Sequence, residues 1–319
     1  MIKKAAELGF LGLYLGRDVG GLGLSRKDSA LIYEALATGD VSTAAYMSIH
    51  QMAANVVDSY GTPEQRQKWV PDMITYNKAA SYALTEPGAG SDAGHIATKA
   101  EKRGGAYYLT GSKCFITGGG YSDVYVVMAR TSDNGAKGIS TFIVPADTPG
   151  MSFGANERKM GWHSSPTAVV HFDNVEVPAE KLVGNVEGMA FKWAMSAVDG
   201  GRINIAAMSL GGARKSFDLA ANYVQERKQF GQPIANNQWV QFTLADMATK
   251  LTASRLFMLD AGNSFDQNTA DKTMKIAMAK TFITEECSHI ADQALQLHGG
   301  YGYLRDFPLE KNVRDLRVN

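Results

Sequence analysis

The sequence predicts a multidomain α+β protein in which a helical segment, a β segment and a second helical segment follow one another. The chain has 319 residues, of which 45% are hydrophobic and 20% charged, and this is typical of two or three packed units. Apolar residues recur at helical spacing in residues 1–79 and 186–319, whereas residues 80–185 contain short alternating runs. A doubly wound sheet is disfavoured, because it requires strands and helices to alternate throughout.

The first segment, residues 1–79, is predicted to form helices joined by glycine-rich turns such as residues 20–23. Residues 42–60 carry Ala, Met, Ile and Val with few charges, which predicts a helix that is buried on most of its surface. Thr62, Pro63 and Gln65 have the pattern of a helix start, with an N-cap, a proline at the first helical position and a residue that completes a capping box.

The second segment, residues 80–185, is predicted to form a small antiparallel sheet or barrel. Four apolar or alternating runs separated by turn signals are expected to be strands: Tyr107–Thr110, Val124–Met128, Ile139–Val144 and Ala168–Phe172. Helical spacing returns after Gly184 and is interrupted at residues 231–233 and 298–302. Residues 186–319 are therefore predicted to form long helices.

Composition disfavours several classes of function. Lys plus Arg and Asp plus Glu both number 32, so no bulk charge attracts nucleic acid or an anionic membrane. Cys114 and Cys287 predict neither a disulfide framework nor a zinc site, and we expect most of the six scattered histidines to be structural or exposed. Without a Walker A, HExxH or Gly-x-Ser-x-Gly motif, hydrolases and metalloenzymes are disfavoured, and no metal is expected.

The sequence also carries expectations about location and completeness. No apolar run approaches the roughly 20 residues of a membrane span, and the first residues lack the pattern of a signal peptide. We therefore expect an intracellular protein, cytoplasmic in a bacterium and in the mitochondrial matrix in a eukaryote. No cap signal precedes Met1 and no helix stop follows Asn319, so we expect both termini to be truncated.

Two segments suit contact with a flat ring. Residues 81–92, Ser-Tyr-Ala-Leu-Thr-Glu-Pro-Gly-Ala-Gly-Ser-Asp, combine hydroxyl groups, glycines and backbone donors, so this loop can approach a ligand closely. Residues 113–120 place an aromatic ring and a hydroxyl group, Phe115 and Thr117, at a strand end. Each segment taken alone also fits an ordinary turn.

Three further segments suit a long ligand that contains phosphate. Asp199-Gly-Gly-Arg202 places two glycines in a helical pattern, at a cost of about 1 kcal/mol each, so either a neighbouring helix or a ligand must come close. Residues 227–231 and 296–300 supply cations, an aromatic ring and bare amides, which suit a pyrophosphate or an adenine. Each of these two segments taken alone also fits a helix C-cap.

Taken together and in this order, these segments resemble the acyl-CoA dehydrogenase family over essentially the whole chain. The matching segments are Tyr82–Asp92, Phe115–Gly118, Asp199–Arg202, Arg227–Gly231, Gln296–Gly302 and Arg314-Asp315. The resemblance implies a helical N-terminal domain, a central β-barrel and a C-terminal four-helix bundle. It also implies bound FAD, an acyl-CoA substrate, an electron-transfer flavoprotein as electron acceptor and a homotetramer built as a dimer of dimers.

The same resemblance implies roles for individual residues. The flavin ring would be lined by Tyr82, Leu84, Thr85, Ser91, Phe115, Ile116 and Thr117. Ser91 would also reach the acyl-CoA, whose pantetheine side would contact Asp199, Gly200, Gly201 and Arg202. The adenine and pyrophosphate would be held, partly across a subunit interface, by Arg227, Phe230, Asn237, Gln238, Gln296, Gly299 and Gly300.

In this family a carboxylate removes the α proton of a thioester while the β hydride passes to flavin N5. In most members that Glu follows shortly after the Arg-Asp-x-Arg stretch, so we expect it beyond Asn319. In two branches it precedes the Arg of the Asp-Gly-Gly-Arg motif, where this sequence has Gly201. Glu86 and Asp199 are not expected to be the base, so the catalytic residue is unknown and this chain alone is expected to be inactive.

Within the family, residues 42–50, 201–206 and 237–248 resemble the branch that oxidises isobutyryl-CoA to methacrylyl-CoA in valine breakdown. Phe115 and Asp199 depart from that pattern, where Trp and Asn are expected. Butyryl-CoA and 2-methylbutyryl-CoA stay open as substrates, because one methylene in an apolar pocket is worth only about 1–3 kcal/mol. An oxidase stays open as well, as does a protein of a different class, an inactive paralogue that still binds flavin and acyl-CoA.

Overall fold

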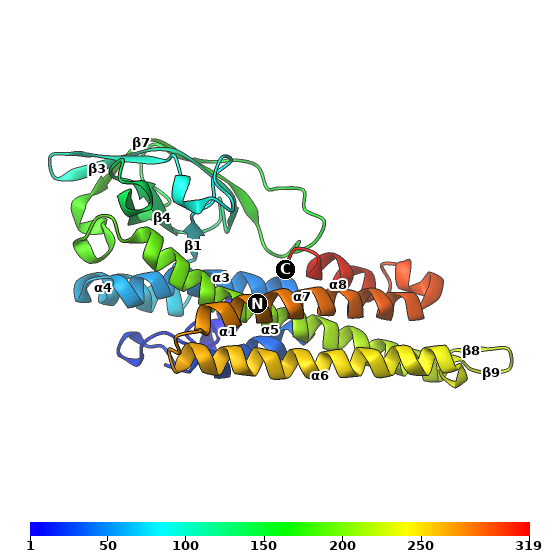
Figure 1. Cartoon of the computed structure of the whole chain (residues 1–319). Helices are drawn as coiled ribbons and strands as arrows, with labels where there is room; N and C mark the ends of the chain where they lie inside the picture. Colours follow the sequence, from blue (N-terminus) through cyan, green and yellow to red (C-terminus); the bar gives the residue numbers. More distant parts are fainter. The chain divides into compact units, whose positions relative to one another are not determined.

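The computed structural model describes residues 1–319 (Figure 1) and divides the chain into two compact units. Unit 1 comprises residues 1–24, 46–158 and 165–198, and unit 2 comprises residues 25–45, 159–164 and 199–319. In sequence order the elements are helices, then strands, then helices, as the hydrophobic spacing predicts. The domain boundaries predicted at residues 79 and 185 follow this order of elements. The two compact units divide the chain differently, because residues 25–45 belong to the same unit as the C-terminal helices.

The helices of unit 1 begin where the sequence signals them. They are α1 (Ile2–Glu7), the part of α3 (Val41–Tyr60) from Tyr46 onward, α4 (Pro63–Ile74) and the start of α5 (Ala190–Glu226). The predicted capping box at the start of α4 is confirmed: the Thr62 hydroxyl accepts from Gln65 N at 3.3 Å, and Gln65 Oε1 accepts from Thr62 N at 3.0 Å.

The strands of unit 1 form one mixed seven-stranded sheet, with β5 paired to β4 and the other strands in the order β1-β4-β2-β3-β7-β6. Their bounds are β1 (Ala80–Ala83), β2 (Lys99–Arg103), β3 (Ala106–Thr117), β4 (Val124–Arg130), β5 (Ile139–Pro145), β6 (Met151–Phe153) and β7 (Thr167–Pro178). All four strands predicted from the sequence are present. The expectation of purely antiparallel pairing is wrong for β1–β4 and β2–β4, which are parallel. The intervening strands let the chain return to the same end of the sheet before β4 begins, and such a crossover permits parallel pairing.

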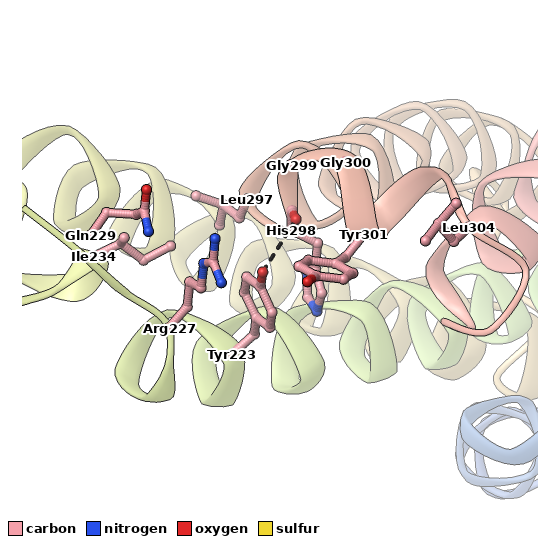
Figure 2. Close-up of a pocket in the computed structure, with 10 residues that line it drawn as sticks. All are labelled: Tyr223, Arg227, Gln229, Ile234, Leu297, His298, Gly299, Gly300, Tyr301 and Leu304. Atoms are coloured by element: carbon pink, nitrogen blue, oxygen red, sulfur yellow. Dashed lines mark hydrogen bonds between the residues drawn. The ribbon is translucent and has the colours of Figure 1, made fainter.

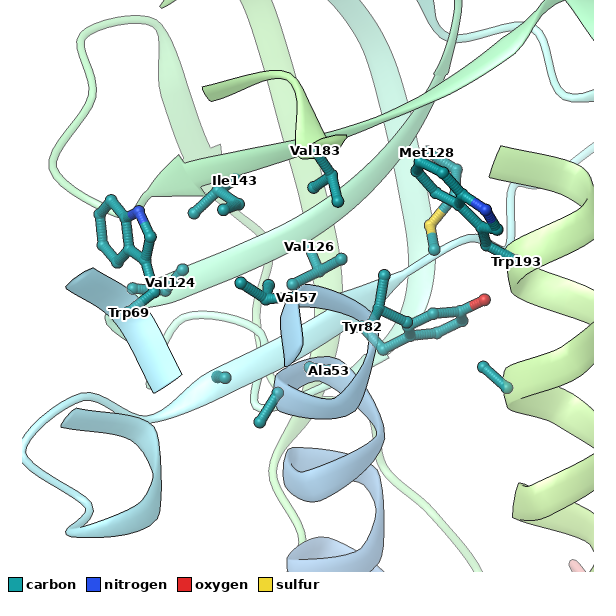
Figure 3. Close-up of a cluster of buried hydrophobic side chains, with 14 of the residues drawn as sticks. Ala53, Val57, Trp69, Tyr82, Val124, Val126, Met128, Ile143, Val183 and Trp193 are labelled. Carbon is teal, nitrogen blue, oxygen red and sulfur yellow. The ribbon is translucent and has the colours of Figure 1, made fainter. Parts of the chain in front are cut away.

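Strand β4 is buried on both faces because each face has its own hydrophobic core. Alternate residues of β4, beginning with Val124, enter a cluster with helices α3, α4 and α5 (Figure 3). The residues between them, beginning with Tyr125, enter a second cluster with β3, β5 and β7. Helices of unit 1 therefore cover one face of β4, and strands β3, β5 and β7 cover the other face.

His50 connects three elements of unit 1 and is 1% exposed. Its Nδ1 accepts from Ala80 N at 2.9 Å, so its Nε2 carries the proton and donates to Met73 O at 2.8 Å. Burial lowers the pKa of His50 below its ordinary value of 6.5, because the charged form loses its hydration. The imidazole therefore stays neutral in the folded protein.

We expect the free energy of unfolding to fall as the pH decreases below about 6.5. In that range the unfolded chain binds a proton at His50 that the folded chain does not, and one such proton changes stability by about 1.4 kcal/mol per pH unit. Urea unfolding between pH 7 and pH 5, compared between the wild type and His50→Gln, measures the effect. The variant should show a flatter pH dependence, and an equal slope in both proteins would contradict the prediction.

Unit 2 consists of helices around the C-terminal part of α5. Besides residues 199–226 of α5 it contains α2 (Arg26–Gly39), α6 (Gln238–Asp266), α7 (Lys272–Leu297), the 3-10 turn η7 (Gly299–Tyr303) and α8 (Leu309–Leu316). A two-stranded hairpin, β8 (Lys228–Gln229) and β9 (Gln232–Pro233), projects between α5 and α6 (Figure 1). The hairpin and η7 occupy the two predicted interruptions of the helical pattern. None of the helices combines the length and apolarity that crossing a bilayer requires.

Helices α2 and α5 approach each other closely at a glycine. A Cβ atom on Gly211 would lie 2.2 Å from the backbone oxygen of Glu34 and 2.8 Å from Ala37 Cβ. Glu34 is buried at this crossing, and its carboxylate accepts from Arg214 at 3.5 Å and from Arg255 at 3.1 Å. The crossing therefore combines a backbone contact with a carboxylate that links α2 to α5 and α6.

Candidate functional site

The structure brings together the two segments of unit 1 that were expected to face a flat ring. Cys114 N donates to Thr85 O at 3.0 Å, and Ser81 Oγ donates to Thr117 O at 2.6 Å. The segment that follows β1 therefore lies against the end of β3. Thr85 and Thr117 are half-buried at this junction, so the sequence motifs at residues 82–85 and 115–117 lie next to each other.

Phe115 is held in a backbone conformation that phenylalanine rarely adopts. Its φ is 56°, and the register of β3 against β7 shifts between Lys113 and Ile116, as in a β-bulge. The bulge turns the ring outward: Phe115 is 69% exposed, whereas Ile116 is 2% exposed. Non-glycine residues in such conformations cluster at ligand sites, so Phe115 marks this strand end as a candidate contact with a ring.

Tyr82 and Ser91 have very different environments. The Tyr82 ring is packed in the core cluster beside α3 and α5 (Figure 3), and its hydroxyl group has no hydrogen-bond partner within the chain. Burial raises the pKa of Tyr82, so the hydroxyl stays protonated and can donate. Ser91 is exposed in the loop, next to Gly88 and Gly90, around which no atom would approach an added Cβ within 4 Å. Leu84, between them, is half-buried.

Sequence reasoning missed Lys113, which is 0% exposed and forms an ion pair with Glu86 at 2.7 Å. The available signal was a lysine that shares a β-strand face with buried apolar residues. The Lys113 ammonium also donates to Leu84 O at 2.9 Å. Burial lowers the pKa of Lys113 to about 8, against the attraction of Glu86. Although burial opposes it, Lys113 and the hydrogen bonds to Glu86 hold the pKa of that carboxyl below its usual value.

The Asp199–Arg202 segment of unit 2 is engaged in contacts within that unit. Asp199 accepts from Arg202 at 2.9 Å and from Thr273 at 2.9 Å, and it is 8% exposed. A Cβ on Gly200 would lie 2.9 Å from Arg26 Cζ. The Arg26 side chain of the neighbouring helix α2 therefore explains why position 200 is a glycine. Gly201 and Arg202 are half-buried.

A cavity of about 440 Å³ lies in unit 2 where α5 meets η7 (Figure 2). Three of the residues expected to hold a nucleotide line it: Arg227, Gly299 and Gly300. The Arg227 guanidinium lies 5.8 Å from the centre of the Tyr301 ring. An added Cβ at either glycine would meet no atom within 4 Å, so this stretch of backbone faces open space.

The wall of the cavity also contains Tyr223, which lies outside the sequence motifs. Tyr223 stacks on His298 with ring centres 4.1 Å apart, and its hydroxyl donates to His298 O at 3.4 Å (Figure 2). Burial lowers the pKa of His298, which favours the neutral imidazole. An aromatic residue four positions before the Arg227 motif on the same helix face was the available signal for Tyr223.

Four predicted residues of unit 2 do not line this cavity: Phe230, Asn237, Gln238 and Gln296. Phe230 occupies the turn of the β8–β9 hairpin with a φ of 54° and is 98% exposed. Asn237 and Gln238 are exposed where α6 begins, and Gln296 is exposed near the end of α7. These exposed side chains can contact something outside this chain, although the Asn237 amide already donates to Ile234 O at 3.1 Å.

The Arg314-Asp315 pair has a structural role within unit 2. Asp315 is 1% exposed, accepts from Trp162 N at 2.6 Å and pairs with Lys311 at 2.6 Å. Arg314 donates to Met160 O at 2.9 Å. The pair therefore holds residues 159–164 against α8.

Comparison with known proteins gives consistent matches over the whole chain. Models of the N-terminal, middle and C-terminal domains of acyl-CoA dehydrogenases match residues 1–77, 81–175 and 188–319. Mitochondrial isobutyryl-CoA dehydrogenase of Dictyostelium discoideum is 53% identical over 100% of this chain and 77% of its own length. Butyryl-CoA dehydrogenase from Megasphaera elsdenii superposes with a TM-score of 0.95 at 36% identity, covering 99% of this chain and 84% of the other. A glutaryl-CoA dehydrogenase from Mycobacterium smegmatis in complex with FADH2 superposes with a TM-score of 0.92 at 29% identity, covering 99% and 80%.

The helix, sheet, helix architecture and these matches define an oxidoreductase that acts on a CH–CH group. The three domain models follow one another in the same order as the helical, β and helical segments. The chain belongs to the acyl-CoA dehydrogenase family.

Proposed function

We propose that this chain binds FAD and a short branched acyl-CoA, and that it serves the oxidation of isobutyryl-CoA to methacrylyl-CoA in valine breakdown. The choice of isobutyryl-CoA as the substrate is supported by the 53% identity with an isobutyryl-CoA dehydrogenase over the whole chain. FAD binding is supported by the hydrogen bond that places residues 82–85 next to the strand end of β3, where Phe115 faces outward in unit 1.

Each of the two units, taken by itself, has residues that fit a part of FAD. In unit 1 an exposed aromatic ring, half-buried hydroxyls and the unpartnered Tyr82 hydroxyl suit the isoalloxazine ring. In unit 2 a guanidinium beside bare backbone suits a pyrophosphate, and the Arg227, Gly299 and Gly300 cavity has the size for part of a nucleotide. When bound, FAD supplies the acceptor for the hydride that leaves the substrate β carbon.

For the acyl-CoA, we assign binding to Ser91 and to residues 199–202. Arg202 is half-buried and paired with Asp199, so it presents an oriented cation rather than a free one. No residue is assigned as the base that removes the α proton. Glu86 is paired with Lys113, Asp199 accepts from Arg202 and Thr273, and position 201 is glycine. A carboxylate in a water-excluded pocket, where desolvation raises its pKa, is required for that step.

We assign a homotetramer, a dimer of dimers, and an electron-transfer flavoprotein as acceptor. Self-association is supported by large apolar side chains that are exposed on α6 and α7: Trp239, Phe242, Leu256, Met274, Met278 and Phe282. Surfaces of this kind mark protein interfaces. The place of the activity is the mitochondrial matrix in a eukaryote and the cytoplasm in a bacterium.

Anaerobic addition of isobutyryl-CoA to the purified yellow protein is expected to shift the visible flavin band. Isobutyryl-CoA should bind more tightly than butyryl-CoA or 2-methylbutyryl-CoA, because pocket shape distinguishes such chains by about 1–3 kcal/mol. Free CoA, which lacks the thioester, is the control and should leave the band unchanged. A reversed order would assign butyryl-CoA or 2-methylbutyryl-CoA as the substrate instead.

Two outcomes of the same titration would contradict parts of the proposal. A protein that carries no flavin, or whose flavin responds to no acyl-CoA, would contradict the function itself. Bleaching of the band would mean that a base for the α proton lies within residues 1–319, which contradicts the expectation that this chain lacks one. Turnover of acyl-CoA by the same preparation would also exclude an inactive paralogue.

A further inference from the structure

A buried ion pair closes the base of the loop between β1 and β2. The Glu86 and Lys113 side chains are 5% and 0% exposed, and Glu86 also accepts from Ala97 N at 2.5 Å and from Thr98 N at 3.0 Å. Glu86 therefore ties the start of the loop to its end. Lys113, through Glu86 and Leu84 O, ties the start of the loop to β3.

The base of the loop is held by side-chain hydrogen bonds, whereas part of its tip is exposed. Near its end Arg130 donates to Ile96 O at 3.0 Å and to Gly94 O at 2.9 Å. In the tip, Gly88 and Gly90 have open space around them and Ser91 is exposed, while Ala89 is buried and exchanges two backbone hydrogen bonds with Glu86. The buried side-chain hydrogen bonds that tie the loop to the strands are thus at its two ends, next to the predicted ring-facing residues.

Stability alone is a poor explanation for this ion pair. Removing two charges from water is costly, and apolar side chains of similar size often support a fold equally well. An ion pair with four directed hydrogen bonds does fix relative position. Here it fixes Leu84 and Thr85 against the strand end that carries Phe115, since Glu86 follows Thr85 directly and Lys113 precedes Phe115 by two residues.

We propose that Glu86 and Lys113 are positioning residues for the flavin ring, holding the segment after β1 and the end of β3 in the one arrangement that binds it. This inference rests on the proposed binding of FAD. Neither residue needs to touch the flavin, because the pair acts through the backbone of Leu84 and Thr85 and through the β3 end at Cys114 and Phe115.

The test measures FAD affinity, backbone exchange and thermal stability for the wild type, Lys113→Met, Glu86→Gln and the double variant. FAD is titrated into apoprotein and followed by quenching of flavin fluorescence. Each single variant should bind FAD at least about tenfold more weakly, because an unpaired buried charge pulls the loop base apart. Amide hydrogens of residues 84–98 and 113–117 should exchange faster. The double variant should bind FAD no more weakly than the more impaired of the two single variants, because each single substitution already breaks the same ion pair.

Gln65→Met is the matched control, because Gln65 clamps a different loop. Its side chain is 6% exposed and its amide donates to Glu180 O and Leu182 O, both at 2.8 Å. This variant should lose thermal stability but keep FAD affinity within about twofold, since its contacts do not involve the ring-facing segments. Lys113 and Glu86 variants that behave like Gln65→Met would overturn the inference.

A conservative variant and the wild type complete the test. If a charge-removing variant fails to fold, Glu86→Asp keeps the charge but shortens the side chain, and it should still weaken FAD binding several-fold with little loss of stability. Unchanged FAD affinity of Glu86→Asp would then overturn the inference. A wild-type protein that does not bind FAD would instead overturn the proposed function, so the two failures are distinguishable.

Discussion

Arg227→Ala is expected to weaken FAD binding by about 20- to 100-fold. The guanidinium lies at the cavity formed with η7, beside bare backbone at Gly299 and Gly300, where it can donate two hydrogen bonds to a pyrophosphate. A hydrogen bond to a charged group is worth about 1.5–3 kcal/mol, and the expected loss corresponds to one such bond, because water can replace the other at the exposed Arg227 position. Titration of apoprotein with FAD measures it directly.

Two further variants control this prediction. Lys228→Ala removes a neighbouring cation that does not line the cavity, and FAD affinity should stay within about twofold. Arg227→Lys keeps the charge but not the planar fork, so it should restore only part of the affinity. Equal effects of Arg227→Ala and Lys228→Ala would mean that general charge, rather than the cavity, attracts the nucleotide.

Gly211→Ala is expected to lower the free energy of unfolding by about 3 kcal/mol. The added Cβ would lie 2.2 Å from Glu34 O, a backbone atom of α2 that cannot rotate away. Helices α2 and α5 must then move apart, and overpacking of this kind costs about 1–3 kcal/mol or more. The shift would also disturb the buried Glu34 carboxylate. Urea denaturation followed by circular dichroism gives the measurement.

Gly39→Ala, in helix α2, which Gly211 of α5 contacts, is the matched control. No atom lies within 4 Å of an added Cβ there. Alanine is the better helix former, so the variant should be as stable as the wild type or more stable by up to about 1 kcal/mol. If Gly211→Ala were equally harmless, the close approach of α2 and α5 would be wrong.

Much of the fold was predictable because its signals are local. The capping box at Thr62, the four strands and the two interruptions of the helical pattern all depend on residues within a few positions of one another. The same is true of the motifs that identify the family. A motif such as residues 82–92 stays recognisable because its glycines and hydroxyls suit a ligand whatever surrounds them.

The candidate site was predictable in its parts but not in its construction. Phe115 was identified from its position at a strand end, whereas the bulge that turns it outward depends on the register between β3 and β7. In the sequence, Lys113 looks like an ordinary lysine of a strand, and only the fold places Glu86 next to it. Tyr223 joined the site only because α5 meets η7 at that point.

The sequence by itself determined the order of the elements, their starts and stops, the family and the segments that carry its chemistry, because hydrophobic period, capping and turn residues act over a few positions. Only the tertiary structure decided the parallel pairing of β1 with β4, the grouping of residues 25–45 with the C-terminal helices, and the neighbour of Gly200. Each of these depends on a contact between residues far apart in the chain. Such contacts are selected by packing of whole surfaces, which no local pattern records.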